Sequence, residues 1–409
     1  MLRTHRWHLL SLLTILLASF LAACGSTTTS GNNDLTGTIS YWAYQASPDG
    51  AQALQQLKTQ FESKHPGAHV NIVPIPKDDF GTKLSTAMAT GTPPDASVAD
   101  QIQVAQFEHD GNIAEMPSGL VNASDFSTVP FNTNIVNGKV YGLPQGQTCI
   151  ALFYNKDLLP TPPTNWSDLI ADAKKTYDPA KKIAAAYFPT TGGYAGWMFP
   201  AFVAQAGGTM LDEQNKKVTF ADKPGVDALT LWKQLYSYSP ADITGGKNAF
   251  QTGHVAMLIS GPWEIPGFAD FPDLHWGVSL LPKDVQNGTN LGGENGVVYQ
   301  KSKHQRLAWE WLKFLSTDGN VTLNDKVSNN FPVYKNDASP DSAWAKEIPA
   351  RATFLQQLDY AQPRPTNPNW NKINDEVVGK AIEKALINNG DPQVTLEDAA
   401  AQAKTILGW

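Results

Sequence analysis

The stretch Gly253-His-Val-Ala-Met-Leu-Ile-Ser-Gly-Pro-Trp263 organises the interpretation of the whole chain. Its central residues are apolar or small on both faces, which is typical of a short strand that is buried on both sides. The strand must stop at Gly261-Pro262, because proline has no backbone N–H to continue the ladder. Trp263 is therefore the first large side chain past a strand end, the edge at which open α/β sheets bind ligands. The stretch alone leaves two interpretations, a core tryptophan and a binding-site aromatic held by a rigid strand.

The amino terminus predicts export and a lipid anchor. Arg3 and Arg6 precede a short apolar run, Leu9 to Leu21, which leads into small residues and Cys24. A basic start, an apolar run below the roughly 20 residues of a membrane span, and small residues at the cut are typical of a secretory signal peptide. The ending Leu-Ala-Ala-Cys resembles the bacterial lipobox, although an ordinary signal peptide with a cysteine nearby is the alternative. The lipobox resemblance implies cleavage before Cys24, lipid on its sulfur, and residence at the outer face of the cell membrane.

A tether and a disulfide-free body are expected to follow. We predict a signal peptide at 1–23 and a flexible tether at 24–34, since residues 26–34 are small and polar. Cys24 and Cys149 are the only cysteines, so with Cys24 assigned to lipid no disulfide forms within one chain. Stability must then come from hydrophobic cores, and the remaining length suits two or three domains of about 150 residues each.

Composition argues against several functional classes. The chain has 31 Lys and Arg against 38 Asp and Glu, a formal net charge of −7, and no basic cluster, which argues against nucleic-acid binding. It has no Gly-x-x-x-x-Gly-Lys-Ser/Thr phosphate loop, so any ATPase must be another chain. The histidines form no helical pair, and Pro66-Gly67 interrupts His65 and His69, so neither a metal site nor a cofactor is expected.

The first part of the body alternates strands and helices. Strands are predicted at 36–42, 70–75 and 96–99, and helices at 54–61 and 80–89, from the spacing of apolar residues. This order favours a parallel sheet with helices on both faces, and therefore an α/β fold.

Cap signals mark two later helices. Thr164 or Asn165 precedes a predicted helix that runs to Lys175. Ile373, Val377, Ala381 and Ala385 form the apolar stripe of another helix, and Thr395-Leu-Glu-Asp398 resembles a capping box that opens the last one.

Several motifs together resemble a known family, the family 1 extracellular solute-binding lipoproteins, which are sugar-binding subunits of ABC importers related to maltose-binding protein. The motifs are, in order, the lipobox, Ala89-Thr90-Gly91-x-x-Pro94-Asp95, Phe153-Tyr154-Asn155-Lys156-Asp157-Leu158-Leu159 with Trp166 downstream, Gly207-Gly208, Gly253-x-Val-Ala-Met with Gly261-Pro262-Trp263, Gly292-Gly293, Ala308-Trp-Glu-Trp-Leu-Lys-Phe-Leu315 and the proline-rich run into Trp370. Each motif is moderately specific alone, but their shared order covers nearly all of the chain.

The resemblance implies a two-lobe periplasmic-binding-protein-like fold (type II), with hinge-connected lobes and a solute cleft between them. Crossings between the lobes are expected near 144–148, 283–290 and 331–336. The first lobe would combine 35–145 with 288–332, and the second would combine 146–285 with 335–409.

Sugar binding requires an aromatic plate for the C–H face of a ring and polar side chains for its hydroxyls. By resemblance, Trp263 and Trp370 match the stacking tryptophans of the maltose-binding family, and Tyr194 or Trp197 lies in a loop that supplies another aromatic. Trp42, Tyr44 and Gln45 follow the first predicted strand, a natural position for cleft residues.

Polar candidates come mainly from strand ends and crossings. The resemblance implies hydroxyl contacts from Asp100 and Gln101, where relatives carry an Asp followed by a polar or basic residue, and from Gln147 and Thr148, near where relatives carry an acidic ligand that is absent here. Gly293, Glu294 and Asn295 form a glycine-rich stretch in which backbone and carboxamide can approach the solute. Arg364 is either a ligand contact or a structural partner of Glu264, and a loop or cap role is the alternative for each polar residue.

The predicted function is binding without catalysis. A neutral mono- or oligosaccharide would be captured by a monomer and delivered to ABC permease subunits that are driven by a separate ATPase. A surface glycoside hydrolase is the main rival, but it needs two facing carboxylates, about 5 or 6.5–9.5 Å apart, and the spacing of Asp100, Glu264 and Glu294 selects no pair. A binding protein for glycerol-phosphate, a polyamine or a peptide is the other rival; a phosphate would need a cationic cluster or a helix amino terminus, and only Arg364 is near the proposed site.

Overall fold

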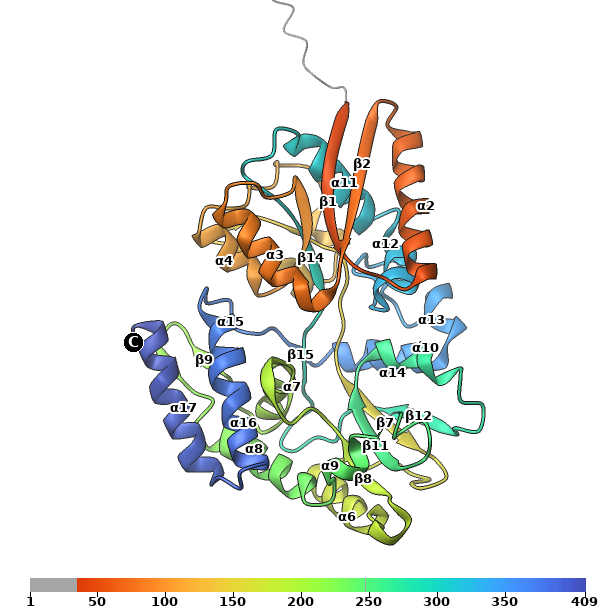
Figure 1. Cartoon of the computed structure of the whole chain (residues 1–409), viewed down its shortest axis with the longest axis vertical. Coiled ribbons are helices and arrows are strands. Elements are labelled where there is room, and N and C mark those ends of the chain that lie inside the picture. The colour runs from red at the N-terminus through yellow and green to blue at the C-terminus, as the bar shows by residue number, and fades with distance from the viewer. Residues whose placement is uncertain (1–34, 247) are drawn as a thin grey trace, which may run out of the picture.

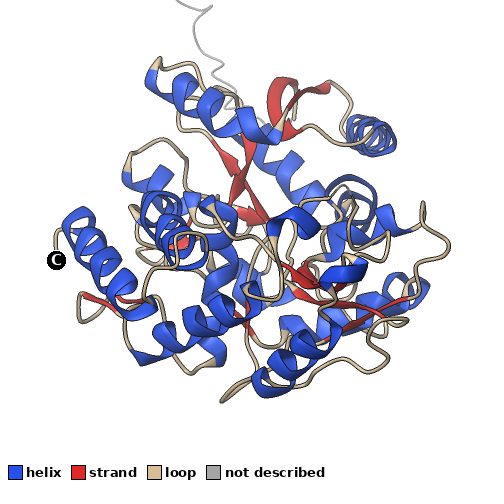
Figure 2. Ribbon diagram, turned by 60° about the horizontal axis from the view of Figure 1, so that its bottom comes forward, coloured by secondary structure: helices blue, strands red, loops and turns tan. Residues whose placement is uncertain are grey.

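The computed structural model describes residues 35–246 and 248–409, which form two lobes along the long axis of the molecule (Figure 1). Each lobe has its own β-sheet and hydrophobic core, and helices surround the strands (Figure 2). Among these residues, no helix has both the length and the apolar character that a bilayer span requires. The predicted signal peptide, the tether and Cys24 lie outside the described residues.

The first lobe is built on a five-stranded sheet with the order β2-β1-β3-β14-β6. Its strands are β1 (Gly37–Tyr44), β2 (Ala68–Ile75), β3 (Ala96–Asp100), β6 (Leu143–Pro144) and β14 (Glu294–Val298). β1 pairs in parallel with β2 and β3, as the alternating pattern predicts, whereas β14 runs antiparallel to β3. The carboxyl end of β3 and the amino end of β14 therefore lie side by side, with Asp100 opposite Glu294.

Helices pack on this sheet through apolar stripes. The lobe contains α2 (Pro48–Lys64), α3 (Lys77–Ala89), α4 (Gln103–His109), η1 (Ala123–Asp125), α5 (Thr128–Asn132), the hairpin of β4 (Ile135–Val136) and β5 (Lys139–Val140), α11 (Gln305–Ser316), α12 (Asn320–Thr322) and the π-helical turn η4 (Leu323–Ser328). The core joins α2 to α11, because the ring of Trp311 lies 5.2 Å from that of Phe61 and 5.7 Å from that of Tyr41.

The second lobe is built on a four-stranded sheet with the order β12-β7-β11-β8. Its strands are β7 (Ala151–Asn155), β8 (Ala184–Tyr187), β11 (Val255–Ser260) and β12 (Trp276–Ser279). β11, the strand predicted from the opening stretch, is buried along its whole length between antiparallel β7 and parallel β8. The strand ends before Gly261, and the short 3₁₀ turn η3 (Pro262–Glu264) follows, as the Gly-Pro break predicts.

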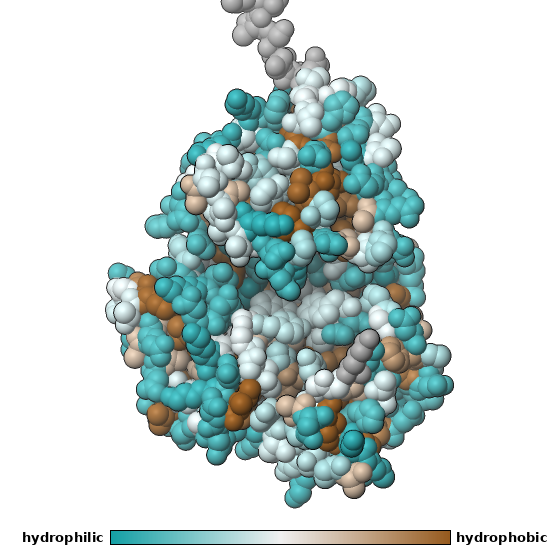
Figure 3. Space-filling model, viewed as in Figure 1, coloured by the Kyte–Doolittle hydropathy of each residue, from teal (hydrophilic) through white to brown (hydrophobic). Residues whose placement is uncertain are grey.

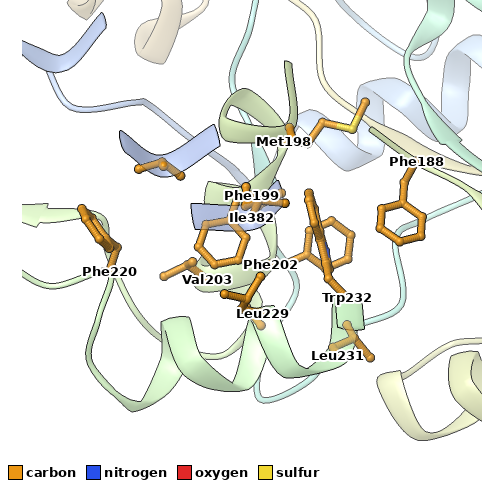
Figure 4. Close-up of a cluster of buried hydrophobic side chains, with 14 of the residues drawn as sticks. Phe188, Met198, Phe199, Phe202, Val203, Phe220, Leu229, Leu231, Trp232 and Ile382 are labelled. Atoms are coloured by element: carbon orange, nitrogen blue, oxygen red, sulfur yellow. The ribbon is translucent and has the colours of Figure 1, made fainter. Parts of the chain in front are cut away.

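Helices enclose the largest core of the molecule on this side. The lobe contains α6 (Trp166–Thr176), η2 (Pro179–Lys181), α7 (Gly192–Gln205), β9 (Leu211–Asp212), β10 (Lys217–Val218), α8 (Lys223–Tyr236), α9 (Ala241–Thr244), α10 (Ile265–Phe268), β13 (Thr289–Asn290), α13 (Ala343–Glu347), α14 (Pro349–Leu358), β15 (Ala361–Gln362), α15 (Trp370–Ile373), the π-helical turn η5 (Asn374–Val378), α16 (Gly379–Leu386) and α17 (Pro392–Leu407). Trp232 lies at the centre of this core, with the rings of Phe188, Phe199 and Phe202 at 5.3, 5.6 and 5.2 Å (Figure 4).

The two predicted helix caps have different outcomes. Asn165 caps α6 by accepting a hydrogen bond from the N–H of Asp168 at 2.9 Å, as predicted. The capping box at Thr395 is wrong, because α17 begins at Pro392 and Asp391 accepts from the N–H of Val394 at 3.0 Å. Proline at the first helical position after an aspartate is the signal that determines this helix start.

Short extended segments join the lobes. Gln147 and Phe331 exchange two backbone hydrogen bonds, at 3.0 and 2.8 Å, and Thr148 and Gly292 exchange two more, at 2.9 and 2.8 Å. Gln147 and Thr148 lie in the segment near 144–148, and Phe331 lies in the segment near 331–336, where crossings are predicted. Gly292 lies just beyond the remaining predicted segment, 283–290.

Residues 283–290 belong with the second lobe. The N–H of Lys283 donates to Thr164, and that of Val285 donates to Gln205, both in that lobe. β13 pairs in parallel with β15. The lobe boundary at 288 stays a prediction, and these hydrogen bonds favour a boundary a few residues later.

Cys149 follows the first crossing directly and is fully buried as a free thiol. Its Sγ lies 3.6 Å from the carbonyl oxygen of Phe354 in α14. Burial raises the pKa of the Cys149 thiol well above its usual value.

Candidate functional site

A cavity of about 560 Å³ lies between the lobes, and the surface is hollowed there (Figure 3). It is lined by Lys77, Asp100, Thr148, Tyr187, Gly193, Tyr194, Trp197, Ile259, Ser260, Trp263, Glu264, Gly293, Glu294, Ser328, Asn330, Arg364, Asn371, Asn374 and Asp375. Its volume is within the range of small-molecule sites, roughly 300–1,000 Å³.

The second lobe supplies an aromatic wall to this cavity. Trp263 comes from η3, directly after β11, and Tyr194 and Trp197 come from the first turns of α7. The rings of Tyr194 and Trp197 are stacked, with centroids 5.8 Å apart, and the Trp263 ring lies 6.0 Å from Trp197 and 6.5 Å from Tyr194. Three rings from two elements thus form one continuous apolar surface.

Glycines allow two of these rings to lie against backbone. A Cβ added at Gly261 would lie 2.1 Å from Cζ3 of Trp263, and one added at Gly292 would lie 2.5 Å from Cζ2 of Trp197. Gly261 has extended dihedral angles (φ −108°, ψ −177°) that any residue adopts. The glycine at 261 is therefore explained by the space that the indole ring needs.

The first lobe and the crossings supply a polar wall. Asp100 and Glu294 are opposite residues of β3 and β14, and Thr148 lies at the first crossing. The carboxylate of Glu294 accepts a hydrogen bond from Asn330, and burial, followed by the nearby charge of Asp100, raises the pKa of Glu294 despite the opposing effects of Lys77, Asn330 and Arg364.

An ion pair joins the two lobes inside the cavity. Arg364, from the loop between β15 and α15, pairs with Asp100 at the end of β3. The Arg364 residue is 6% exposed. The sequence left open whether Arg364 contacts the ligand or pairs with Glu264; in the structure its carboxylate partner is Asp100, and Glu264 instead accepts from the hydroxyl of Ser260 at 2.8 Å.

Several buried polar atoms of the cavity lining have no hydrogen-bond partner among the described residues. They are Oγ1 of Thr148, Oδ1 of Asn374 and Nε of Arg364. Thr148 and Asn374 are each 4% exposed. Because an unpaired buried polar group costs about 1–3 kcal/mol, such atoms indicate where a polar ligand supplies the missing partner.

The sequence is also similar to that of known proteins. A sequence profile of the bacterial extracellular solute-binding proteins matches residues 46–322. The chain belongs to this family. This result confirms the family predicted from the ordered motifs.

Relatives of this solute-binding protein span nearly its whole length. The galactooligosaccharide-binding protein of Bacillus subtilis (strain 168) is 27% identical over 410 residues, covering 94% of this chain and 93% of the relative. A maltooligosaccharide ABC transporter solute-binding lipoprotein of Streptococcus pneumoniae (strain ATCC BAA-255 / R6) is 27% identical over 412 residues, covering 92% and 93%. The GacH receptor of Streptomyces glaucescens GLA.O, solved unliganded and with acarbose, superposes with a TM-score of 0.80 at 24% identity, covering 92% of this chain and 99% of that one. The predicted two-lobe fold is confirmed.

Nine of the residues predicted for the site of this solute-binding protein line the cavity together. They are Asp100, Thr148, Tyr194, Trp197, Trp263, Glu264, Gly293, Glu294 and Arg364. Tyr44 and Gln45 line a smaller adjoining chamber of about 200 Å³, which shares Lys77, Glu294 and Ser328 with the main cavity.

Trp370 does not reach the cavity. It is fully buried in the core of the second lobe, on the same helical face as Ile373 and Val377. Asn371 and Asn374, from the same turns, line the cavity instead. The proline-rich run places this helix at the site, but its tryptophan faces inward.

Four other predicted residues also lie outside the cavity lining. Trp42 packs on the core of the first lobe, because β1 continues to Tyr44 and residue 42 is still inside the strand. Gln101 is 4% exposed and donates to the carbonyl of Gly292 at 3.2 Å.

Gln147 and Asn295, the last two predicted residues outside the cavity lining, make buried hydrogen bonds within the protein. Gln147 donates to the carbonyl of Pro332 at 2.8 Å and to the hydroxyl of Ser127 at 3.1 Å. Asn295 donates to the hydroxyl of Thr133 at 3.1 Å and accepts from Asn134 at 3.0 Å.

Sequence reasoning missed several lining residues. They are Lys77, Tyr187, Gly193, Ile259, Ser260, Ser328, Asn330, Asn371, Asn374 and Asp375. Tyr187 and Ser260 end the parallel neighbours β8 and β11, so the rule that ligands bind at strand carboxyl ends could have found them.

No metal centre accompanies this site. Within residues 35–246 and 248–409, no group of three or more His, Cys, Asp or Glu is arranged to hold a metal ion.

Proposed function

We propose that this solute-binding protein captures a saccharide between its lobes and passes it to the permease of an ABC importer. The observation that carries the proposal is the pairing of a three-ring aromatic wall on one lobe with hydrogen-bonding groups from the other lobe and the crossings. Pyranose rings have the matching chemistry, with C–H faces that pack on aromatic rings and hydroxyls that both donate and accept. Relatives named for galactooligosaccharide and maltooligosaccharide transport support the same class of ligand.

Lobe closure is the proposed consequence of binding. A saccharide that contacts Trp263 on one lobe and Glu294 on the other interacts with both walls only when the lobes are close, so it favours the closed population. The protein acts as a monomer without catalysis, and a separate ATPase drives import. A chromogenic glycoside should therefore release no product when incubated with the protein.

A lipid anchor on Cys24 is the proposed means of retention at the outer face of the cell membrane, in the cell envelope. The support comes from the Leu-Ala-Ala-Cys ending and from the name of the pneumococcal lipoprotein relative. Mass spectrometry of the membrane-extracted protein tests it, since Cys24→Ala should abolish the lipid mass and release the protein from the membrane.

Ligand binding is tested on protein that lacks its first 25 residues. Tryptophan emission and the melting temperature are measured against a panel of mono-, di- and oligosaccharides. A true ligand at a hundredfold excess over its dissociation constant should add about 2.7 kcal/mol of stability. Trp263→Ala should shift the response to higher saccharide concentration, whereas Trp409→Ala, outside the cavity lining, should leave it unchanged. A folded protein that responds to no saccharide in the panel contradicts the proposal.

A further inference from the structure

The charges that face the interlobe cavity are unbalanced. Its described lining includes four carboxylates and two cations, and no histidine. The carboxylates are Asp100, Glu264, Glu294 and Asp375, and the cations are Lys77 and Arg364. Because carboxylates also accept from sugar hydroxyls, the arrangement of these groups matters more than their number.

Within the part of the chain that the structure describes, only one of the two cations has an ion-pair partner. Arg364 pairs with Asp100. Lys77 lies at the end of the cavity that adjoins the smaller chamber, beside Glu294, with its Nζ 5.4 Å from the centroid of the Tyr44 ring. Arg364 is therefore occupied by Asp100, and Lys77 lies in the part of the lining that is shared with the smaller chamber.

The two carboxylates of the second lobe have only neutral donors. The hydroxyl of Ser260 donates to Glu264 at 2.8 Å, and the amide of Asn374 donates to Asp375 at 2.7 Å. Among the described residues, no ion pair joins either carboxylate to Lys, Arg or His. Both therefore present negative charge to the cavity.

The side chain of Asn374 holds Asp375 in place. Its Nδ2 donates to the carbonyl of Gly193 at 3.0 Å and to Asp375, which fixes the orientation of the amide. Its Oδ1 is buried against Gly196 of α7. Asp375 is therefore the acceptor that a ligand meets here, and an ammonium group suits a carboxylate because it has three donors and no acceptor.

The aromatic wall favours the same charge. Gly193, whose added Cβ would lie 2.3 Å from Oδ1 of Asp375, begins the turn that carries Tyr194 and Trp197. The carboxylate thus lies against the segment that presents these rings. Cations are attracted to the faces of tyrosine and tryptophan rings.

We propose that the saccharide bound in this cavity carries a protonated amine, as in an amino sugar, with the ammonium group at Asp375 beside the aromatic wall. The inference rests on the proposed saccharide binding and narrows its ligand class. It also disfavours phosphorylated or uronic-acid ligands, since Arg364 is paired with Asp100 and the described lining has four carboxylates against two cations.

Matched saccharide pairs test this inference by isothermal titration calorimetry. The pairs are glucosamine and glucose, galactosamine and galactose, and deacetylated chitobiose and cellobiose. At pH 6 we expect the amine of at least one pair to bind tenfold or more tightly than its neutral partner. At pH 9 the advantage of glucosamine, galactosamine or chitobiose should fall, because such amines lose their proton near pH 8, as α-amino groups do at about 7.7–8.0.

Charge-removing variants locate the ammonium site. Asp375→Asn should bring the amine-to-neutral affinity ratio close to one, whereas Glu376→Gln, which removes a neighbouring carboxylate outside the cavity lining, should leave the ratio unchanged. Asp100, Arg364 and Glu376 are the charged groups that act on Asp375, so the ratio is compared at constant ionic strength. If Asp375→Asn melts early, Glu264→Gln is the second variant and should lower the same ratio.

The outcomes separate this inference from the proposed function. Equal affinity within every pair that binds overturns the amine inference and leaves saccharide binding intact. Absence of binding by both members of all pairs, and by the wider saccharide panel, overturns both.

Discussion

Replacing Gly261 with alanine should weaken saccharide binding by moving the ring of Trp263, without unfolding the protein. The added Cβ would lie 2.1, 2.2 and 2.6 Å from three carbons of that ring. Carbon atoms in ordinary contact are about 3.5–4.0 Å apart, so the ring must move by roughly 1.5 Å. The backbone at residue 261 is extended, so alanine itself adds no conformational strain.

The expected loss follows from what the displaced ring contributes. Trp263 stands about 6 Å from Trp197, and a ring that has moved no longer continues the aromatic wall. Loss of one stacking surface is on the order of 1–2 kcal/mol, or about a five- to thirtyfold increase in dissociation constant. Calorimetry with the tightest-binding saccharide of the panel measures this increase. Gly267→Ala is the matched control, because a Cβ there meets no atom within 4 Å.

A double-mutant cycle decides whether the ring is the cause. In a Trp263→Ala background the added methyl has no ring to displace, so Gly261→Ala should then change the affinity by less than twofold. An equal loss in both backgrounds would refute the argument and point to a backbone change at the end of β11.

Three further predictions concern residues around the site. Trp370→Ala should lower the unfolding free energy by about 3–5 kcal/mol in urea titrations while the folded protein keeps its saccharide affinity, because Trp370 is a core residue; a loss of affinity at unchanged stability would contradict this. Glu294→Gln should raise the melting temperature of the ligand-free protein at pH 7. The pKa of Glu294 in the folded protein is raised above 4.5, so ionisation of this carboxyl destabilises the fold at pH 7. The difference in melting temperature between Glu294→Gln and the unsubstituted protein should therefore shrink as pH falls toward 4.5. A difference that does not vary with pH would show that charge is not the reason. Asp100→Asn should remove the ion pair with Arg364, which contributes about 1 kcal/mol because the Asp100 side chain is partly exposed. The ligand-free population should then shift toward open lobes, which small-angle X-ray scattering detects as a larger radius of gyration. An unchanged radius is the contrary result.

Local patterns in the sequence predicted the parts of the site that depend on one element. The apolar run of β11, its Gly-Pro break and the position of Trp263 are all encoded within eleven consecutive residues. For the same reason the parallel start of the first sheet could be predicted from alternating strands and helices. These features need no knowledge of how distant segments pack.

Tryptophans whose position depends on packing were harder to interpret. Trp370 lies three residues before Ile373, so it continues the apolar stripe that also contains Val377, and helical periodicity alone could have assigned it to the core. Trp42 was assigned to the cleft because the first strand was predicted two residues too short. An error of two residues at a strand end changes which side chains lie beyond it.

The polar wall could not be derived from the sequence in the same way. Lys77, Asn330 and Asp375 come from three elements that are far apart in the chain, and only the packing of the two lobes brings them to one cavity. Each is an ordinary polar residue near the beginning or end of a helix or turn, and such positions carry no local signal for ligand binding.

The buried thiol next to the first crossing gives the molecule a built-in reporter of local opening in the second lobe. Protein without its first 25 residues retains one cysteine, Cys149, whose side chain is fully covered and whose thiolate form is suppressed by burial. A thiol reagent can modify it only during excursions that separate the crossing from α14, so the labelling rate counts those excursions. Cysteines introduced on the outer surface of each lobe would react far sooner, which allows dyes to be attached in pairs for distance measurements while the native thiol stays unlabelled.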